Sequence, residues 1–319
     1  MQSLWMLFAS LMFSIMGVCV KLASDHYSIA EIVLSRGLIG MLFIIVLILL
    51  KGGTLKTPIP RQHVWRGVIG VISLSMWFYS FSLLPVATAT TLNYTSSIWL
   101  AAILFGSAWW RGNTRFDWGM AATIVISFIG VMLLMKPSLD TNQTLGGMIA
   151  LASGLIAAVA YLQVRHLGTL GEPEYRVVFY FSMTSTIAGL AGSTLLPGGG
   201  VPFWHAHNMQ GVALLITLSL SATVAQMAMT RAYRLGNPLL TANLQYTGIV
   251  FSSIWGILIW HDQLGWRGWL GTAVILIGGL LATFYNQKKA RPLKPLHSAL
   301  HSENPLDNKI NQTTETRSL

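Results

Sequence analysis

Residues 83–97 read LLPVATATTLNYTSS, a proline turn after an apolar run followed by a helix start rich in hydroxyl groups. Residues 234–247 read RLGNPLLTANLQYT and repeat this plan. Pro85 and Pro238 each stand where a helix can begin, because the first helical residue needs no partner for an amide hydrogen. Both stretches therefore predict a sharp turn that leads directly into a helix.

These two stretches are the strongest sign of an internal repeat. Tyr94-Thr95 falls opposite Tyr246-Thr247 once a slip of one residue after the proline is allowed. A weaker match, at one constant offset, joins Trp118, Gly130 and Leu133 to Trp266, Gly278 and Leu281. The chain therefore reads as two related halves.

Composition identifies the class of protein. The 319 residues are 53% hydrophobic and only 9% charged, whereas a soluble domain has about 25% charged residues. The formal net charge of +10 does not indicate nucleic-acid binding, because the cations stand in short loops and a tail between apolar runs. The single cysteine, Cys19, excludes an intrachain disulfide. We expect an integral membrane protein.

A bilayer core requires about 20 mostly apolar residues per helix, and this rule predicts ten membrane spans. Their predicted limits are Ser3–Leu22, Ile29–Leu50, Trp65–Leu83, Val86–Trp109, Phe116–Met135, Leu145–His166, Val177–Leu196, Gln210–Tyr233, Pro238–Trp260 and Trp266–Tyr285.

The loop charges predict the orientation, since cytoplasmic loops carry the excess of Lys and Arg. With the N-terminus inside, sixteen cations face the cytoplasm, Arg66 among them, and three face outward: Lys21, Lys136 and Arg267. Arg36 alone is predicted well inside a span. Both termini are therefore expected in the cytoplasm.

Five spans per half is an odd number, so the second half should enter the membrane in the opposite sense, as in many secondary transporters. The predicted fold is all-α, with ten transmembrane helices in two inverted five-helix repeats. We expect the first repeat over 1–135, an external linker over 136–144, the second repeat over 145–285 and a disordered cytoplasmic tail over 286–319.

Three short motifs resemble those of a known family. Residues 77–81 read WFYSF and lead to LPVATA at 84–89, while Ala232-Tyr233 leads to Gly236-Asn237-Pro238. With ten spans in two fives, residues 2–286 resemble the EamA family of the drug/metabolite transporter superfamily. The resemblance implies that the third, fourth, eighth and ninth spans line a central cavity, and it is specific for the fold rather than for the substrate.

The chain departs from the family pattern in two places of the fourth span. Many relatives carry a proline where this chain has Thr95-Ser96-Ser97, and an acidic residue where it has Trp110-Arg111. The second half keeps an acid at the matching place, Asp262. The resemblance therefore does not carry over a symmetric pair of acidic gate residues.

Polar side chains at membrane depth are costly unless they face protein or a water-filled cavity, so they are candidates for substrate binding. Tyr94 and Tyr246 lie at matched depth from opposite faces, and amides stand beside them. The alternative is that the amides only hold helices together. The candidates are Tyr79, Asn93, Tyr94, Gln226, Asn243, Gln245 and Tyr246.

Arg36 completes the predicted site. It could bind a substrate carboxylate or close an external gate with Glu31, or it could snorkel toward the interface. Trp77 and Tyr233 are gating candidates, with interfacial anchoring as the alternative.

No enzyme or cofactor motif emerges. His205 and His207 lack a third ligand at a fixed spacing, so no metal site is expected. The glycines 198–200 lack the lysine of a phosphate-binding loop. We therefore expect no cofactor and no catalytic residue.

The sequence predicts a secondary transporter in the cytoplasmic (inner) membrane that exports an amino acid or a related small polar metabolite. Uptake of a vitamin or nucleoside-like cofactor is the alternative, and a membrane enzyme of lipid metabolism is a third reading. Since the deep spans contain almost no carboxylate, facilitated diffusion or exchange is favoured over proton coupling. The expected partners are a small-molecule substrate and the lipid bilayer, without nucleic acid, and the protein should be a monomer or homodimer.

Overall fold

The computed structural model describes residues 2–84, 86–110, 118–135, 144–195, 208–261 and 265–290. All regular secondary structure in these ranges is helical. The elements are η1 (Gln2–Leu4), α1 (Trp5–Ala23), α2 (Ile29–Lys51), α3 (Pro60–Leu83), α4 (Val86–Asn93), α5 (Ser96–Trp110), α6 (Trp118–Met135), α7 (Thr144–Thr169), α8 (Glu174–Leu195), α9 (Met209–Leu235), α10 (Pro238–Gln245), α11 (Thr247–Trp260) and α12 (Trp266–Ala290).

In the described part of the chain, the helices follow the predicted spans. The main difference in length is at α3, which begins at Pro60 rather than Trp65, and at α12, which continues to Ala290. Five stretches are long and apolar enough to cross a bilayer: Gln2–Ala23, Ile29–Lys51, Thr144–Thr169, Met209–Leu235 and Pro238–Trp260. They support a multi-pass membrane protein, and the total of ten crossings stays a prediction.

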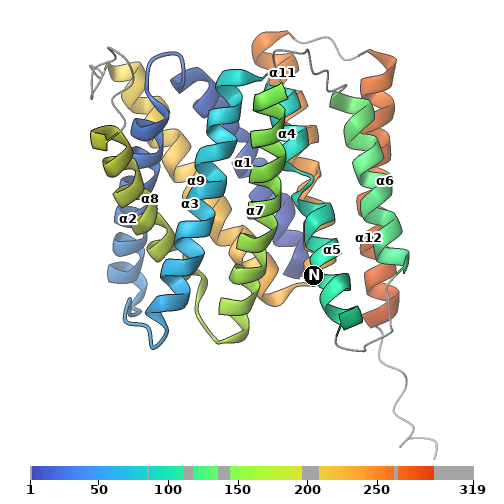
Figure 1. The fold of residues 1–319 in the computed structure, drawn as a ribbon, viewed down its shortest axis with the longest axis horizontal. Helices are drawn as coiled ribbons and strands as arrows, with labels where there is room; N and C mark the ends of the chain where they lie inside the picture. The colour runs from blue at the N-terminus through green and yellow to red at the C-terminus, as the bar shows by residue number, and fades with distance from the viewer. Residues whose placement is uncertain are drawn as a thin grey trace, which may run out of the picture.

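The helices pack into one bundle (Figure 1). At one end of its long axis α2 packs on α8, and at the other end α6 packs on α12. Between these pairs α1 packs on α9 and α3 packs on α7, while α7 also contacts α9. Helices from the first half of the chain therefore pack mainly against helices from the second half.

The fourth and ninth predicted spans are each broken in the middle, the first at Tyr94-Thr95 and the second at Tyr246. At both breaks a threonine hydroxyl donates to the carbonyl three residues earlier, from Thr95 to Leu92 at 2.7 Å and from Thr247 to Leu244 at 2.7 Å. Such local hydroxyl bonds compete with the helical hydrogen bonds and bend helices. The breaks therefore occur at the Tyr-Thr pair that the sequence repeats.

The second proline turn forms as predicted. Pro238 is the first residue of α10, and the Asn237 side chain caps that helix by accepting hydrogen bonds from the amides of Leu239 (3.0 Å) and Leu240 (3.3 Å). Pro85 lies outside the described residues, and α4 begins directly after it at Val86.

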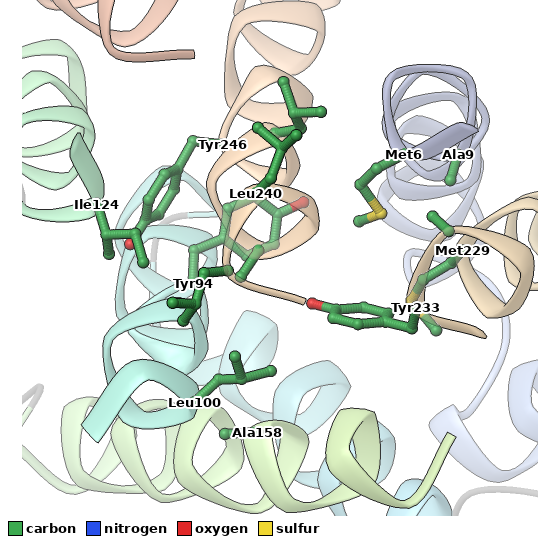
Figure 2. Packing of buried hydrophobic residues seen from close by; sticks show 14 of the residues in the cluster. Met6, Ala9, Tyr94, Leu100, Ile124, Ala158, Met229, Tyr233, Leu240 and Tyr246 are labelled. Atoms are coloured by element: carbon green, nitrogen blue, oxygen red, sulfur yellow. The ribbon is translucent and has the colours of Figure 1, made fainter. Parts of the chain in front are cut away.

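The largest buried cluster lies around the second broken helix (Figure 2). Tyr246 lies beside Ile124 of α6, and its ring centroid is 6.4 Å from that of Phe128. Tyr233 lies in the same cluster as Met229, on α9. Both tyrosines are 0% exposed, so they belong to the packed core.

Candidate functional site

A cavity lies between helices from both halves, at the level of the two broken helices. It is lined by residues of α3, α4, α9 and α10, the four spans that the family resemblance implies, and also by residues of α1, α2, α7 and α8. Six residues singled out in the sequence line it: Arg36, Trp77, Asn93, Tyr94, Gln226 and Gln245.

One wall of the cavity carries two positive charges. The guanidinium carbon of Arg36, on α2, lies 4.9 Å from the ring centroid of Phe181, on α8. The guanidinium carbon of Arg66, on α3, lies 4.5 Å from the same centroid. The two side chains are 5% and 3% exposed, so neither reaches bulk solvent as a snorkelling arginine would.

These two arginines have no counter-charge among the described residues. No carboxylate is among the described residues that line the cavity. The buried Nε of Arg36 and the buried Nε and Nη1 of Arg66 also have no hydrogen-bond partner in the described part of the chain. A cation–π contact gives about 0.5–2 kcal/mol, whereas an unpaired buried ion costs several kcal/mol. Phe181 alone therefore does not compensate for burying both charges.

Arg66 is not among the predicted site residues, because it stands at the start of the predicted third span and counts there as a cytoplasmic cation. Since α3 begins at Pro60, Arg66 stands almost two turns inside the helix. The missed signal was the proline, which favours the first position of a helix. Gly70, one turn later, leaves the space that Arg66 fills, because a Cβ there would collide with Arg66 Nη1 and lie 2.8 Å from Phe181 Cε2.

Other residues of the lining are uncharged and polar. The Asn93 amide donates to Ser153 Oγ at 2.8 Å, and the Gln245 amide donates to the Tyr161 hydroxyl at 3.3 Å. Gln226 is 5% exposed, and its buried Nε2 has no hydrogen-bond partner among the described residues. The cavity thus combines a cationic wall with amides that can donate and accept hydrogen bonds.

Five predicted site residues lie outside the cavity lining. Tyr79 is 46% exposed, since it stands two residues from Trp77 and so points to another side of α3. Asn243 is 1% exposed and accepts a hydrogen bond from Ser127 Oγ at 3.1 Å. Tyr246 belongs to the core cluster described above.

The two remaining gating candidates have packing and capping contacts. Tyr233 stacks on Tyr161, with ring centroids 5.2 Å apart and planes at 16°. Glu31 forms a capping box with Ser28 at the start of α2, where its carboxylate accepts a hydrogen bond from the Ser28 amide at 2.8 Å.

A second polar cluster, which we call the edge cluster, consists of Thr57, His63, Glu172 and Arg176. The Glu172 carboxylate accepts hydrogen bonds from Thr57 Oγ1 (2.7 Å) and Arg176 Nη1 (2.8 Å), and it lies 3.2 Å from His63 Nε2. Burial would raise the pKa of Glu172, but these partners outweigh burial and lower that pKa below its ordinary value. The cluster ties the α2–α3 loop to the start of α8.

The described residues contain no group of three or more His, Cys, Asp or Glu side chains that could hold a metal ion. His205, His207 and the glycines 198–200 lie outside the described residues, as does Asp262.

Comparison with known proteins gives relatives that are transporters. The chain is 29% identical to the pseudopaline exporter CntI of Pseudomonas aeruginosa, over 86% of this chain and 90% of the exporter. It is 23% identical to an S-adenosylmethionine uptake transporter of Rickettsia bellii, over 76% of this chain and 78% of that transporter.

A solved crystal structure has the same fold, with a TM-score of 0.73 and 19% identity over 88% of this chain and 98% of that chain. The model of the EamA-like transporter family matches residues 1–136 and 144–284. The resemblance inferred from the turn motifs is confirmed, and the chain belongs to the EamA-like transporter family.

Proposed function

We propose that the protein is a secondary transporter that moves a small polar organic metabolite across the cytoplasmic membrane through the central cavity. The observation that carries this proposal is the position of the cavity, between helices of both halves and beside two broken helices. Transporters commonly bind substrate at such a place, because interrupted helices offer backbone groups and polar side chains at membrane depth.

Alternating access by two inverted halves is part of the proposal, and the packing supports it. If the halves are matched span by span, the contact of α1 with α9 corresponds to that of α7 with α3, and the contact of α2 with α9 corresponds to that of α8 with α3. The glycines matched between the halves, Gly130 and Gly278, also occupy corresponding positions, since each lies at the contact between α6 and α12. Gly130 approaches Gly271 O and Ile275 N of α12, where a Cβ would lie 2.9 Å from either atom, and Gly278 approaches Ser127 of α6.

We propose export of an amino acid or related compound, with uptake of a nucleoside-like compound or vitamin as the alternative, since relatives include both an exporter and an uptake transporter. Among the described residues the cavity lining contains no carboxylate, which favours facilitated diffusion or exchange over proton coupling. We propose a role without catalysis, since the relatives are named as transporters.

The orientation within the proposal rests on the sixteen-to-three distribution of loop cations. Single cysteines in a Cys19→Ala background test it in intact cells with an impermeant thiol reagent. Asn142→Cys should be labelled from outside and Thr57→Cys should be spared. The reverse labelling would place the termini outside and contradict the orientation.

Counterflow in proteoliposomes tests the function. Liposomes that contain the full chain are preloaded with one member of a panel of amino acids, carboxylic acids, nucleosides and vitamins, and uptake of the same labelled compound is measured. We expect at least one panel member to accumulate above protein-free liposomes, and Asn93→Ala and Gln245→Ala to reduce that signal. Folded protein that accumulates no member would refute transport of these metabolites.

A further inference from the structure

The two cavity arginines carry a positive charge that nothing else in the described structure neutralises. The structure describes four acidic residues, and each of them lies outside the cavity lining. Glu172 and Glu174 pair with Arg176 and Arg234, Glu31 caps α2, and Asp25 is exposed. No acidic side chain of the described residues therefore neutralises the two arginines of the cavity wall.

The geometry brings the two charges close to each other. Both guanidinium carbons lie within 5 Å of one ring, at 4.9 and 4.5 Å, so their separation cannot exceed the sum of these distances. Like charges at such a separation repel strongly in a medium of low dielectric constant. Since Arg36, Arg66 and Phe181 come from α2, α3 and α8, packing of three helices imposes this arrangement.

The side chains are suited to acidic oxygen atoms. Each guanidinium is a planar fork of donors that can grip a carboxylate or phosphate with two hydrogen bonds. Three of the buried donor nitrogens, on Arg36 and Arg66, are unpartnered among the described residues. A single carboxylate would neutralise only one of the two charges.

We propose that Arg36 and Arg66 form a double cation site for a substrate that carries two negative charges on acidic oxygens, either as two carboxylates or as one phosphate monoester. This inference rests on the proposed function and names its substrate class. The acidic groups lie against the Arg36–Phe181–Arg66 wall, and the amides of Asn93, Gln226 and Gln245 bind the polar remainder of the molecule. Amino acids with one carboxylate match the wall less well than dianions.

Binding to the purified full-length protein tests the inference independently of transport. The probes are succinate, glutarate and glycerol 3-phosphate, each beside its uncharged counterpart: succinamide, glutaramide and glycerol. The measured quantity is the shift of the thermal unfolding midpoint with probe concentration, which reports binding to the folded state.

We expect at least one dianion to raise the midpoint in a saturable manner while its neutral counterpart does not. Arg36→Gln and Arg66→Gln should weaken this binding at least tenfold. Arg36→Lys and Arg66→Lys keep the positive charge and should weaken dianion binding less than the glutamine variants do. They also keep the test possible if a glutamine variant does not fold. Arg234→Gln is the matched control, since Arg234 lies in a partly buried ion pair outside the cavity lining, and it should leave the binding unchanged.

Stabilisation by the dicarboxylates alone or by the phosphate ester alone identifies the kind of acidic group and supports the inference. Equal shifts by dianions and their neutral counterparts, no shift by any dianion, or shifts unaffected by both glutamine variants overturn it. Arginine-dependent binding of dianions without counterflow would contradict the proposed function but not this inference. Counterflow of neutral compounds that is independent of both arginines would support the proposed function and contradict this inference.

Discussion

The arginines of the central cavity and those at the edge cluster differ in their partners. In the edge cluster, Arg176 lies 2.8 Å from the Glu172 carboxylate, and nearby Arg234 lies 2.9 Å from Glu174. In the cavity, Arg36 and Arg66 are more deeply buried, both lie against the ring of Phe181, and neither has a carboxylate partner among the described residues. The paired arginines join segments of the chain, whereas the cavity arginines are the ones for which we propose a role in binding.

The largest expected effect is on transport of an acidic compound. Arg66→Gln should reduce it at least tenfold, because a hydrogen bond to a charged group contributes about 1.5–3 kcal/mol and a factor of ten is about 1.4 kcal/mol. Arg234→Gln, measured by the same counterflow assay and corrected for folded protein, should stay within about twofold of wild type. Similar losses in both variants would remove the distinction between cavity and edge.

A smaller effect is expected on stability at the edge. Glu172→Gln leaves Arg176 without its counter-ion and should destabilise the protein by about 1–3 kcal/mol, seen as a lower midpoint of thermal unfolding. Glu174→Gln is the control, since Glu174 is more exposed and pairs with Arg234 alone among the described residues. Glu174→Gln should lower the midpoint of thermal unfolding less than Glu172→Gln does. An equal or greater decrease for Glu174→Gln would show that the cluster around Glu172 is not the stabilising unit.

The lowered pKa of Glu172 predicts a dependence of stability on pH. The folded carboxyl binds protons less readily than the unfolded one, whose pKa is about 4.3. Its stabilising contribution is therefore complete above that value and is lost as the pH falls through the lower, folded pKa. Unfolding midpoints between pH 6 and pH 3 should fall more steeply for wild type than for Glu172→Gln, and parallel curves would exclude this contribution.

The smallest effect is expected at Tyr79, which lies outside the cavity. Tyr79→Ala should leave counterflow within about twofold of wild type, because this exposed side chain does not line the cavity. Tyr94→Ala, which removes a lining ring 6.5 Å from that of Trp77, should reduce it clearly. A loss at Tyr79 as large as that at Tyr94 would show that the cavity boundary is drawn wrongly.

Much of the helical fold could be predicted, because a bilayer imposes apolar runs of about 20 residues. The turn motifs also lead to the cavity, since Asn93, Tyr94 and Gln245 lie at the broken helices and line it. Positions along a helix were less certain. Trp77 lines the cavity and Tyr79 does not, because residues two apart face different sides of a helix.

The role of Arg66 in the cavity wall and the edge cluster are not predicted from the sequence, for two physical reasons. Arg66 is the second residue of the predicted third span and counts there as a cytoplasmic cation, because hydropathy marks where apolar residues begin, whereas α3 begins earlier, at Pro60. The edge cluster joins Thr57 to Glu172 across 115 positions of sequence, and only helix packing brings such residues together. Asn243 is predicted to bind substrate, yet its hydrogen bond with Ser127 on α6 places it at a helix interface, outside the cavity lining.

The most direct test compares the unfolding midpoints of the ligand-free protein with Arg66→Gln and with Arg176→Gln. Removing an unmatched buried charge should raise the midpoint, since it relieves repulsion from Arg36 and a desolvation cost, as is common when a binding residue is replaced. Removing the paired Arg176 should lower it, because Glu172 is left without its counter-ion. Opposite signs are the predicted result, and a fall in both variants would contradict the claim that the cavity arginines are kept for a ligand rather than for the fold.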